Sequence, residues 1–209
     1  MKRGYLIGID AGTTAVKGIL VRSSGQIVCS AGREYSLEYP APDRCELDPE
    51  IYWQSTLYVI RALLRRSKVE PGRIAALAIS SQGETIIPVD QQGRPLRKAI
   101  VWLDNRSAQE ADEIKSRFAA ETLFRRTGQP EIIAMWPATR MLWLQRNEPE
   151  HFANTARFLL VEDFLIHKLC GCFAANESML SSTLLFDIVR KQWWPDMLNH
   201  LGITIDQLP

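Results

Sequence analysis

The fold is decided by the stretch Ile7-Gly8-Ile9-Asp10-Ala11-Gly12-Thr13-Thr14-Ala15-Val16-Lys17. The apolar run that leads into it, from residue 5 to residue 9, predicts a buried strand. A polar turn with a glycine follows and leads into a second apolar run, Val16 to Val21. A third run, Gln26 to Val28, comes after the turn Ser23-Ser24-Gly25. Strands separated by such short turns pair with their neighbours, so the sequence predicts that the first three strands form an antiparallel meander.

A helix is predicted to follow the meander. Asp48-Pro49-Glu50 combines an N-cap carboxylate, a proline at the first helical position and an acidic residue in the first turn. Trp53, Leu57, Ile60 and Leu64 then recur at spacings of four, three and four residues. This spacing predicts one apolar stripe that faces the core.

The rest of the chain contains further predicted strands and helices. Apolar runs predict further strands at Ile74–Ile79, Ile86–Val89, Ala99–Trp102 and Phe158–Val161. Helices are predicted at Ala108–Arg117, Ala119–Arg126, Pro137–Arg146 and Asp163–Leu169. The order of elements predicts an α/β fold with a mixed sheet flanked by helices.

Composition excludes several classes of function. The chain has 209 residues, and its 25 Lys and Arg against 24 Asp and Glu give a net charge of +1. Nucleic acids and acidic membranes attract an excess of positive charge, so neither is expected as a partner. The first apolar run stops at Asp10, too early for a signal peptide or a membrane span, and we expect a cytoplasmic protein.

The four cysteines are too few and too scattered for a disulfide framework. Cys170, Cys172 and His167 suggest a partial metal site, but structural zinc needs four ligands and there is no second pair. Buried or idle thiols are the favoured interpretation.

The turn after the first strand has the residues of a phosphate site. Gly12 allows a ligand to approach the backbone, and successive backbone N–H groups in such a turn bind anions. Thr13 and Thr14 add hydroxyl groups, and Lys17 adds a positive charge. Asp10 could hold Mg²⁺ through water, because Mg²⁺ keeps several waters and takes few protein ligands. A plain hairpin turn with an Asx-type bond at Asp10 explains the same residues equally well.

Other nucleotide and hydrolase motifs do not occur. The sequence has no G-x-x-x-x-G-K-[ST] loop and no G-x-G-x-x-G loop that opens a helix. It also has no G-x-S-x-G nucleophile turn. His151, His167 and His200 lie outside any catalytic motif, and surface or packing roles account for them.

The stretch Gly8-Ile9-Asp10-Ala11-Gly12-Thr13-Thr14 resembles the first phosphate motif of the sugar kinase, heat-shock protein and actin superfamily. Five further segments resemble, in the same order, the N-terminal half of FGGY-family carbohydrate kinases. They are Glu46-Leu47-Asp48-Pro49 with Trp53, Ile79-Ser80-Ser81-Gln82-Gly83-Glu84, Ala99-Ile100-Val101-Trp102-Leu103-Asp104-Asn105-Arg106, Met135-Trp136-Pro137-Ala138-Thr139-Arg140-Met141-Leu142-Trp143-Leu144, and Asp163-Phe164-Leu165 with Leu169 and Gly171. Each match alone is weak, but six in order over nearly the whole chain are specific.

The resemblance implies a ribonuclease H-like, actin-like ATPase fold and ATP-dependent phosphorylation of a sugar or polyol hydroxyl. It places Asp10 beside Mg²⁺ and the γ-phosphate of ATP, with Gly12, Thr13 and Thr14 as the phosphate hairpin. Lys17 falls where glycerol kinases carry an arginine, so a phosphate contact by Lys17 is expected to be less bidentate.

The resemblance also implies the substrate contacts. Gln82, Gly83 and Glu84 fall at the sugar-contacting loop, and the Glu84 carboxylate could accept hydrogen bonds from two neighbouring hydroxyl groups. Trp102 could offer a ring face to the substrate, although a role as a core aromatic is equally expected. Asp104 and Arg106 are also placed at the substrate site, where an ion pair that braces it is more expected than substrate contact.

Departures from the family pattern bear on the substrate. Glycerol kinases carry an arginine where this chain has Gly83 and a tyrosine where it has Met135. Arg140 stands where the family usually has lysine. The loss of hydroxyl-binding donors at Gly83 and Met135 opens the pocket, so the expected substrate is a pentulose such as xylulose, with glycerol less expected.

The resemblance leaves part of the enzyme outside residues 1–209. In the family the catalytic base is an aspartate beyond the region matched here, and the ATP-binding domain is C-terminal; both would follow Pro209. We therefore expect residues 1–209 to be the N-terminal sugar-binding and phosphate-hairpin domain, inactive alone. The alternative is a non-catalytic sugar-binding or regulatory module on the same fold. Whether the full-length protein forms a homodimer stays open.

Overall fold

The computed structural model describes residues 4–209. The chain divides into two compact units, each described here by itself. Unit 1 consists of residues up to Leu37 together with Pro49–Gln82, and unit 2 consists of Glu38–Asp48 and Gly83–Pro209. Among the described residues, no helix combines the length and apolar character that a membrane crossing requires.

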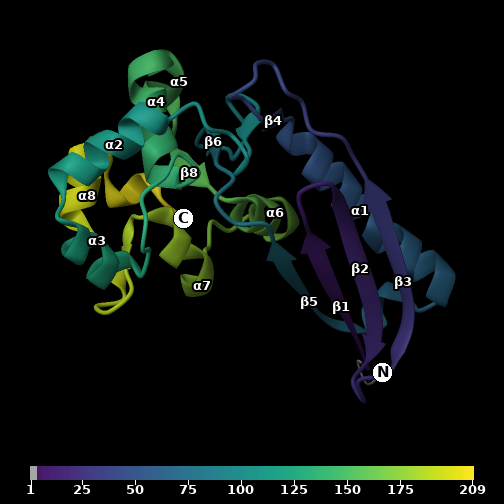
Figure 1. The fold of residues 1–209 in the computed structure, drawn as a ribbon. Helices are drawn as coiled ribbons and strands as arrows, with labels where there is room; N and C mark the ends of the chain where they lie inside the picture. Colours follow the sequence, from purple (N-terminus) through teal and green to yellow (C-terminus); the bar gives the residue numbers. More distant parts are fainter. Residues whose placement is uncertain (1–3) are drawn as a thin grey trace. The chain divides into compact units, whose positions relative to one another are not determined.

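Unit 1 is built on a four-stranded sheet with the order β3-β2-β1-β5 (Figure 1). The strands are β1 (Tyr5–Ala11), β2 (Ala15–Arg22), β3 (Ile27–Glu34) and β5 (Ile74–Ser81). β1 to β3 form an antiparallel meander, and β5 adds to the free edge of β1 in parallel. The predicted mixed sheet with three antiparallel strands is therefore confirmed.

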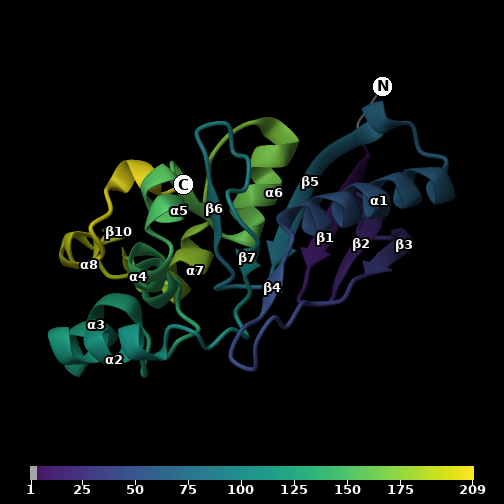
Figure 2. The same cartoon turned by 90° about the horizontal axis from the view of Figure 1, so that it is seen from above.

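One face of this sheet is covered by helix α1 (Pro49–Ser67), which begins at the predicted proline (Figure 2). The predicted stripe of Trp53, Leu57, Ile60 and Leu64 is wrong in one respect, because these side chains are only half-buried. The buried face of α1 carries mostly smaller or polar residues: Pro49, Tyr52, Ser55, Thr56, Val59, Ala62 and Leu63.

The reason for this difference lies in β2. Gly18 has no side chain, and a Cβ there would lie 2.6 Å from Cγ1 of Val59. The helix therefore approaches the sheet closely along its face of smaller residues, which leaves the larger apolar residues at the flanks. Side-chain size across the contact decided which helix face is buried, and periodicity alone does not carry that information.

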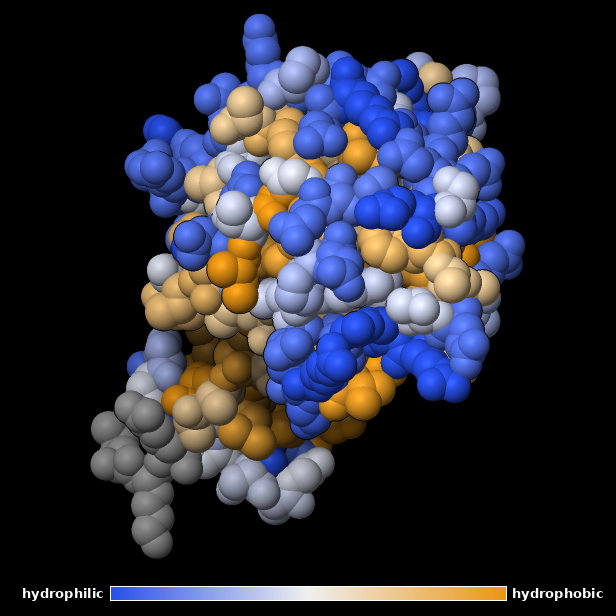
Figure 3. All heavy atoms as spheres, turned by 90° about the vertical axis from the view of Figure 1, so that its left-hand side faces the viewer, coloured by the Kyte–Doolittle hydropathy of each residue, from blue (hydrophilic) through white to orange (hydrophobic). Residues whose placement is uncertain are grey.

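The opposite face of the sheet is exposed and partly apolar. Leu6 and Ile19 are 38% and 40% exposed. Strands β1, β2, β3 and β5 line a hollow of about 620 Å³ there, with Asp10, Lys17 and Ser80 among its walls. Hydrophobic side chains also gather at the lower left of Figure 3.

Unit 2 combines short antiparallel strand pairs with helices. The pairs are β4 (Glu46–Leu47) with β7 (Ala99–Ile100), β6 (Ile87–Val89) with β8 (Arg157–Leu159), and β9 (Phe186–Asp187) with β10 (Gln192–Trp193). The helices are α2 (Ala108–Arg117), α3 (Ala120–Thr127), α4 (Pro137–Asn147), α5 (Pro149–Asn154), α6 (Val161–Cys170), α7 (Glu177–Leu180) and α8 (Pro195–Leu201). Short 3-10 turns are η1 (Pro71–Arg73) in unit 1, and η2 (Ser181–Thr183) and η3 (Ile205–Gln207) in unit 2.

The core of unit 2 surrounds α4, in which residues 137 to 144 are all buried. Trp143 and Trp194 lie in this core with Leu142, Leu144 and Met197. The predicted helices of unit 2 are confirmed within about two residues at their ends. The shorter elements α5, α7, α8, β9 and β10 were not predicted, since pieces of two to seven residues carry too little periodicity.

Candidate functional site

The predicted phosphate hairpin is the connection between β1 and β2. Asp10 is the last exposed residue of β1 and lies directly opposite the exposed Lys17 of β2. Both side chains are therefore on the exposed face of the sheet. The N–H of Gly12 donates to the carbonyl of Ala15 at 3.0 Å, which closes the turn. A phosphate would therefore be bound by the threonines of the turn and by Lys17 rather than by the Gly12 N–H. Thr13 is half-buried and Thr14 is exposed.

Two tyrosines, which the sequence reasoning missed, connect the hairpin to Gln82. The hydroxyl of Tyr35 donates to the carbonyl of Gly12 at 2.5 Å. The ring of Tyr35 packs edge-on against Tyr52, with 5.6 Å between ring centroids. Gln82 donates from its Nε2 to the Tyr52 hydroxyl at 2.7 Å, and its buried Oε1 has no hydrogen-bond partner among the described residues. Burial and the nearby charge of Asp10 raise the pKa of Tyr35, so its hydroxyl stays protonated as a donor.

Asp10 is the candidate metal ligand of unit 1. Its carboxylate is exposed and faces the hollow of the sheet. Within residues 4–209, no cluster of three or more His, Cys, Asp or Glu side chains could hold a metal ion. A single exposed carboxylate is a ligand that Mg²⁺ can take, because Mg²⁺ keeps most of its waters and binds one or two carboxylates.

Gly83 and Glu84 of the predicted sugar segment begin the second stretch of unit 2. Glu84 is half-buried and has a φ of 59°, in the left-handed region that residues other than glycine rarely occupy. Thr85 is buried, and its Oγ1 accepts a hydrogen bond of 3.1 Å from the N–H of Trp102. This hydrogen bond connects the residue that follows Glu84 to the half-buried Trp102.

Arg140 of α4 binds the backbone of this segment. Its side chain has 0% exposure, which is rare for a charged residue. One guanidinium nitrogen donates to the carbonyl of Glu84 at 2.7 Å. The other donates to the carbonyls of Trp102 and Asp104, at 2.8 and 3.1 Å. Desolvation lowers the pKa of Arg140 to about 10, which still leaves it charged at neutral pH.

Asp104 and Arg106 form the predicted ion pair. Two guanidinium nitrogens of Arg106 donate to the two oxygens of the Asp104 carboxylate, each at 2.8 Å. The same carboxylate accepts the N–H of Cys45 at 2.6 Å. Both side chains are almost completely buried, at 0% and 1% exposure. This burial favours a bracing role over direct contact with a substrate.

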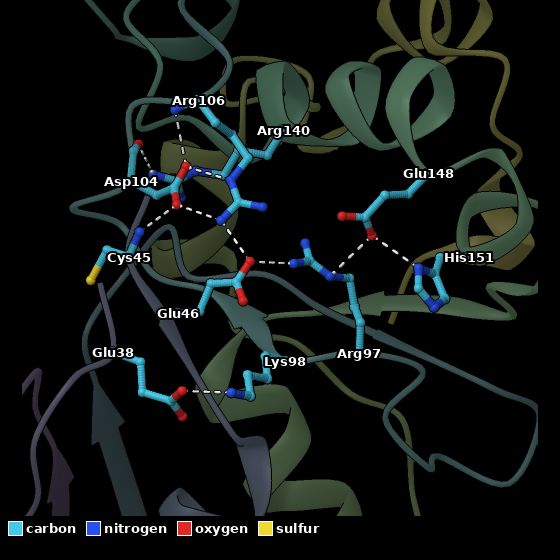
Figure 4. A network of polar contacts seen from close by, with 10 residues as sticks. All are labelled: Glu38, Cys45, Glu46, Arg97, Lys98, Asp104, Arg106, Arg140, Glu148 and His151. Atoms are coloured by element: carbon cyan, nitrogen blue, oxygen red, sulfur yellow. Dashed lines mark hydrogen bonds and ion pairs between the residues drawn. The ribbon is translucent and has the colours of Figure 1, made fainter. Parts of the chain in front are cut away.

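The ion pair continues into a row of alternating charges (Figure 4). Arg106 contacts Glu46 at 2.6 Å, and Glu46 also contacts Arg97. Arg97 reaches Glu148 at 3.2 Å, which in turn contacts His151 at 2.9 Å. Glu46 and Glu148 therefore each lie between two groups that can carry positive charge.

Gly83 and Met135 were predicted from the family pattern. A Cβ at Gly83 would lie at ordinary contact distance, 3.6 Å from the Ser182 hydroxyl and 3.7 Å from Cε of Met179. Ser182 and Met179 belong to α7 and the turn after it, a region that sequence reasoning did not connect to the site. Met135 is half-buried and packs against the core of unit 2.

The predicted residues thus fall into two groups. Those of the phosphate hairpin, together with Gln82, belong to unit 1. The other predicted substrate residues belong to unit 2. Within unit 2, hydrogen bonds join the segments that carry Glu84, Trp102, Asp104 and Arg106. Met135 packs against the core of this unit.

Comparison with known proteins decides the family. The family described as "FGGY family of carbohydrate kinases, N-terminal domain" matches residues 5–209. The chain belongs to this family. It is similar to a xylulose kinase of Staphylococcus xylosus, with 30% identity over 95% of this chain and 41% of that protein. It is also similar to a glycerol kinase of Thermococcus gammatolerans, with 34% identity over 98% of this chain and 42% of that protein.

A solved structure confirms the fold. The gluconate kinase of Lactobacillus acidophilus superposes with a TM-score of 0.91 at 30% identity, over 98% of this chain and 41% of that one. The FGGY chain therefore has the predicted actin-like ATPase fold class. It spans about two-fifths of the length of the relatives it matches.

Proposed function

We propose that this FGGY chain takes part in ATP-dependent phosphorylation of a hydroxyl group on a sugar or polyol. The observation that carries the proposal is the Glu84 segment, in which the buried Arg140 donates to the backbone carbonyl of the half-buried Glu84, and the hydroxyl of Thr85 accepts the N–H of Trp102. A carboxylate on a backbone held in this way is suited to accept hydrogen bonds from neighbouring hydroxyl groups.

The phosphate side of the reaction is assigned to the hairpin. Phosphoryl transfer depends on positioning and on neutralising the charge of the phosphates. Thr13, Thr14 and Lys17 would contact phosphate oxygens, and Asp10 would hold Mg²⁺ through its exposed carboxylate. Bound Mg²⁺ would supply charge neutralisation at the γ-phosphate. The Tyr35 hydroxyl keeps the hairpin in shape through Gly12.

The remaining chemistry is assigned to the part of the family's length that this chain does not cover. The reaction needs a base near the acceptor hydroxyl and a pocket for the adenine. Neither is assigned to a residue of this chain, so we propose that residues 1–209 bind the sugar but do not turn it over alone.

The substrate class rests on the departures from glycerol kinases. Gly83 and Met135 stand where glycerol kinases carry an arginine and a tyrosine, so two hydroxyl-binding donors are lost at these positions. We therefore propose a pentulose such as xylulose. Relatives named for xylulose, glycerol and gluconate match at 30 to 34% identity, so overall identity does not discriminate among these sugars.

Calorimetric titration tests the sugar class. Xylulose, gluconate and glycerol are titrated into the chain, into Glu84→Gln and into the matched control Glu121→Gln, an exposed carboxylate of α3 paired with Arg125. We expect xylulose to bind most tightly and E84Q alone to weaken it, by about ten-fold for a lost charged hydrogen bond. Absence of binding for all three ligands would refute the sugar proposal.

A coupled assay for ADP tests the proposal that residues 1–209 do not turn the sugar over alone. With ATP, Mg²⁺ and each sugar, residues 1–209 should give no more ADP than a reaction without sugar. Sugar-dependent ADP formation would show that the chain is catalytically complete, contrary to the proposal.

A further inference from the structure

Arg140 is buried in an unusual way. Its guanidinium is removed from water, yet among the described residues its hydrogen bonds go to backbone carbonyls and not to a carboxylate. Burying a charge is costly unless it is well hydrogen-bonded. The planar fork of arginine can hold separate acceptors in a fixed geometry, which an ammonium group cannot do. The groups that Arg140 contacts therefore show which part of the structure this buried charge stabilises.

The acceptors come from two loops that are distant in sequence. The Glu84 carbonyl belongs to the sugar segment, and the Trp102 and Asp104 carbonyls belong to the loop after β7. A second link joins the same loops, from the N–H of Trp102 to the Thr85 hydroxyl. Arg140 thus ties together the backbone of the residues predicted to contact the sugar.

Glu84 needs such a restraint. Its left-handed φ of 59° is unfavourable for a residue with a Cβ and persists only when the surroundings impose it. The Arg140 bond acts on the carbonyl of this same residue. The Glu84 and Asp104 carboxylates also favour the charged form of Arg140, which opposes the effect of burial.

We propose that Arg140 is the positioning residue of the sugar segment. Its guanidinium holds the Glu84 backbone against the loop of residues 102–104, so that the Glu84 carboxylate is presented in one orientation. The role in substrate binding rests on the proposed function, whereas the ordering of the two loops does not.

Hydrogen exchange of the sugar-free chain tests the ordering. The variant is Arg140→Lys, which keeps the charge but cannot reach both groups of carbonyls from one nitrogen. The matched control is Arg126→Lys, a partly buried arginine of unit 2 that pairs with Asp187 and lies outside the sugar segment and the row of charges. In R140K we expect amide exchange in peptides covering residues 83–87 and 101–105 to rise at least about ten-fold, the factor for losing one charged hydrogen bond. In R126K these peptides should exchange as in the unchanged chain.

A purely structural role predicts a different pattern. Exchange would then rise equally throughout unit 2 in R140K, and this result, or no change at residues 83–87, would overturn the proposal. Should R140K not fold, the double variant with Glu84→Gly decides, because glycine adopts the left-handed conformation without a restraint. Recovery of a folded chain with slow exchange at residues 83–87 supports the proposal, and failure of the double variant to fold overturns it.

Titration with xylulose completes the test. R140K should weaken xylulose binding about ten-fold or more, and R126K should leave it within about two-fold. Unchanged binding in R140K would overturn the role in positioning for the substrate. If the unchanged chain binds no sugar, the proposed function fails, while the exchange pattern still decides whether Arg140 orders the two loops.

Discussion

The phosphate hairpin and the sugar segment are two loops that the same chain stabilises by different means. The hairpin is held by backbone hydrogen bonds, by the uncharged hydroxyl of Tyr35 and by a close-packed sheet. The sugar segment is held by the buried charges of Arg140, Asp104 and Arg106. A neutral hydrogen bond contributes about 1 kcal/mol, whereas a buried charge that loses its partner costs several. The sugar segment should therefore be the more fragile of the two.

Removal of Asp104 should have the largest effect. In Asp104→Ala the buried Arg106 loses its bidentate partner and the Cys45 N–H loses its acceptor. We expect a loss of about 3–5 kcal/mol in the free energy of unfolding, measured by urea denaturation. Asp112→Ala, which removes an exposed partner of Lys115, serves as the control and should cost less than about 1 kcal/mol. Equal effects of the two variants would contradict the comparison.

Asp163 sharpens the comparison, because it is a buried carboxylate of unit 2. One of its oxygens accepts the N–H of Leu160, and the other has no hydrogen-bond partner among the described residues. Burial raises its pKa from 3.8 to about 7. As pH rises from about 4 to about 7, the unfolded chain releases this proton while the folded chain retains it, so stability falls. The contribution is on the order of 2–4 kcal/mol.

Asp163→Asn should remove this pH dependence. The stability difference between D163N and the unchanged chain, measured by urea denaturation at pH 4, 5.5 and 7, should shift steadily in favour of D163N. Asp112→Asn should show no such shift, since that side chain is 77% exposed. A difference that stays constant with pH would show that Asp163 is ionised in the folded state.

Gly18 tests whether unit 1 depends on packing. A Cβ at this position would lie 2.6 Å from Cγ1 of Val59 and 3.0 Å from Cδ1 of Ile9. We expect Gly18→Ala to cost about 1–3 kcal/mol through overpacking, seen as a lower Tm. Gly32→Ala on the neighbouring strand is the control, because its nearest contact would be an ordinary 3.6 Å. If G32A lowers the Tm as much, strand propensity rather than the helix contact is responsible.

The smallest effect is expected in the hairpin itself. Tyr35→Phe removes the hydroxyl that donates to the Gly12 carbonyl but keeps the ring that packs on Tyr52. The expected loss is about 1 kcal/mol, measured by urea denaturation at neutral pH. Tyr58→Phe alters a tyrosine that is 44% exposed and should be neutral. A loss of 3 kcal/mol or more in Y35F would remove the contrast between the two loops.

The features that the sequence predicted well are those encoded locally. Short apolar runs around glycine turns predicted the meander of unit 1, and Pro49 marked the start of α1. The spacing of Asp104 and Arg106 allowed the ion pair to be anticipated, because the two residues are close along the chain in any conformation. The motif order predicted the family, which the match over residues 5–209 confirms.

The features that escaped prediction depend on contacts between distant segments. The buried face of α1 depends on the absence of a side chain at Gly18, in a strand more than 30 positions away. Arg140 looks like an ordinary helix arginine until its partners, 36 to 56 residues earlier in the chain, are known. The same holds for Tyr35 and for Ser182 beside Gly83. The individual contacts to substrate and nucleotide stay predictions.

The alternating row from Asp104 to His151 also restricts how this region can change during evolution. Three inner members of the row, Arg106, Glu46 and Arg97, each contact two groups of the opposite sign. Replacing one of them by a neutral residue leaves its two former partners, which carry like charges, without the group between them. A neutral substitution at Glu46 would leave Arg97 and Arg106 together without an acceptor between them. Substitutions in this row should therefore be accepted in compensating pairs. The hairpin of unit 1, which is held by uncharged hydrogen bonds, should accept substitutions one residue at a time.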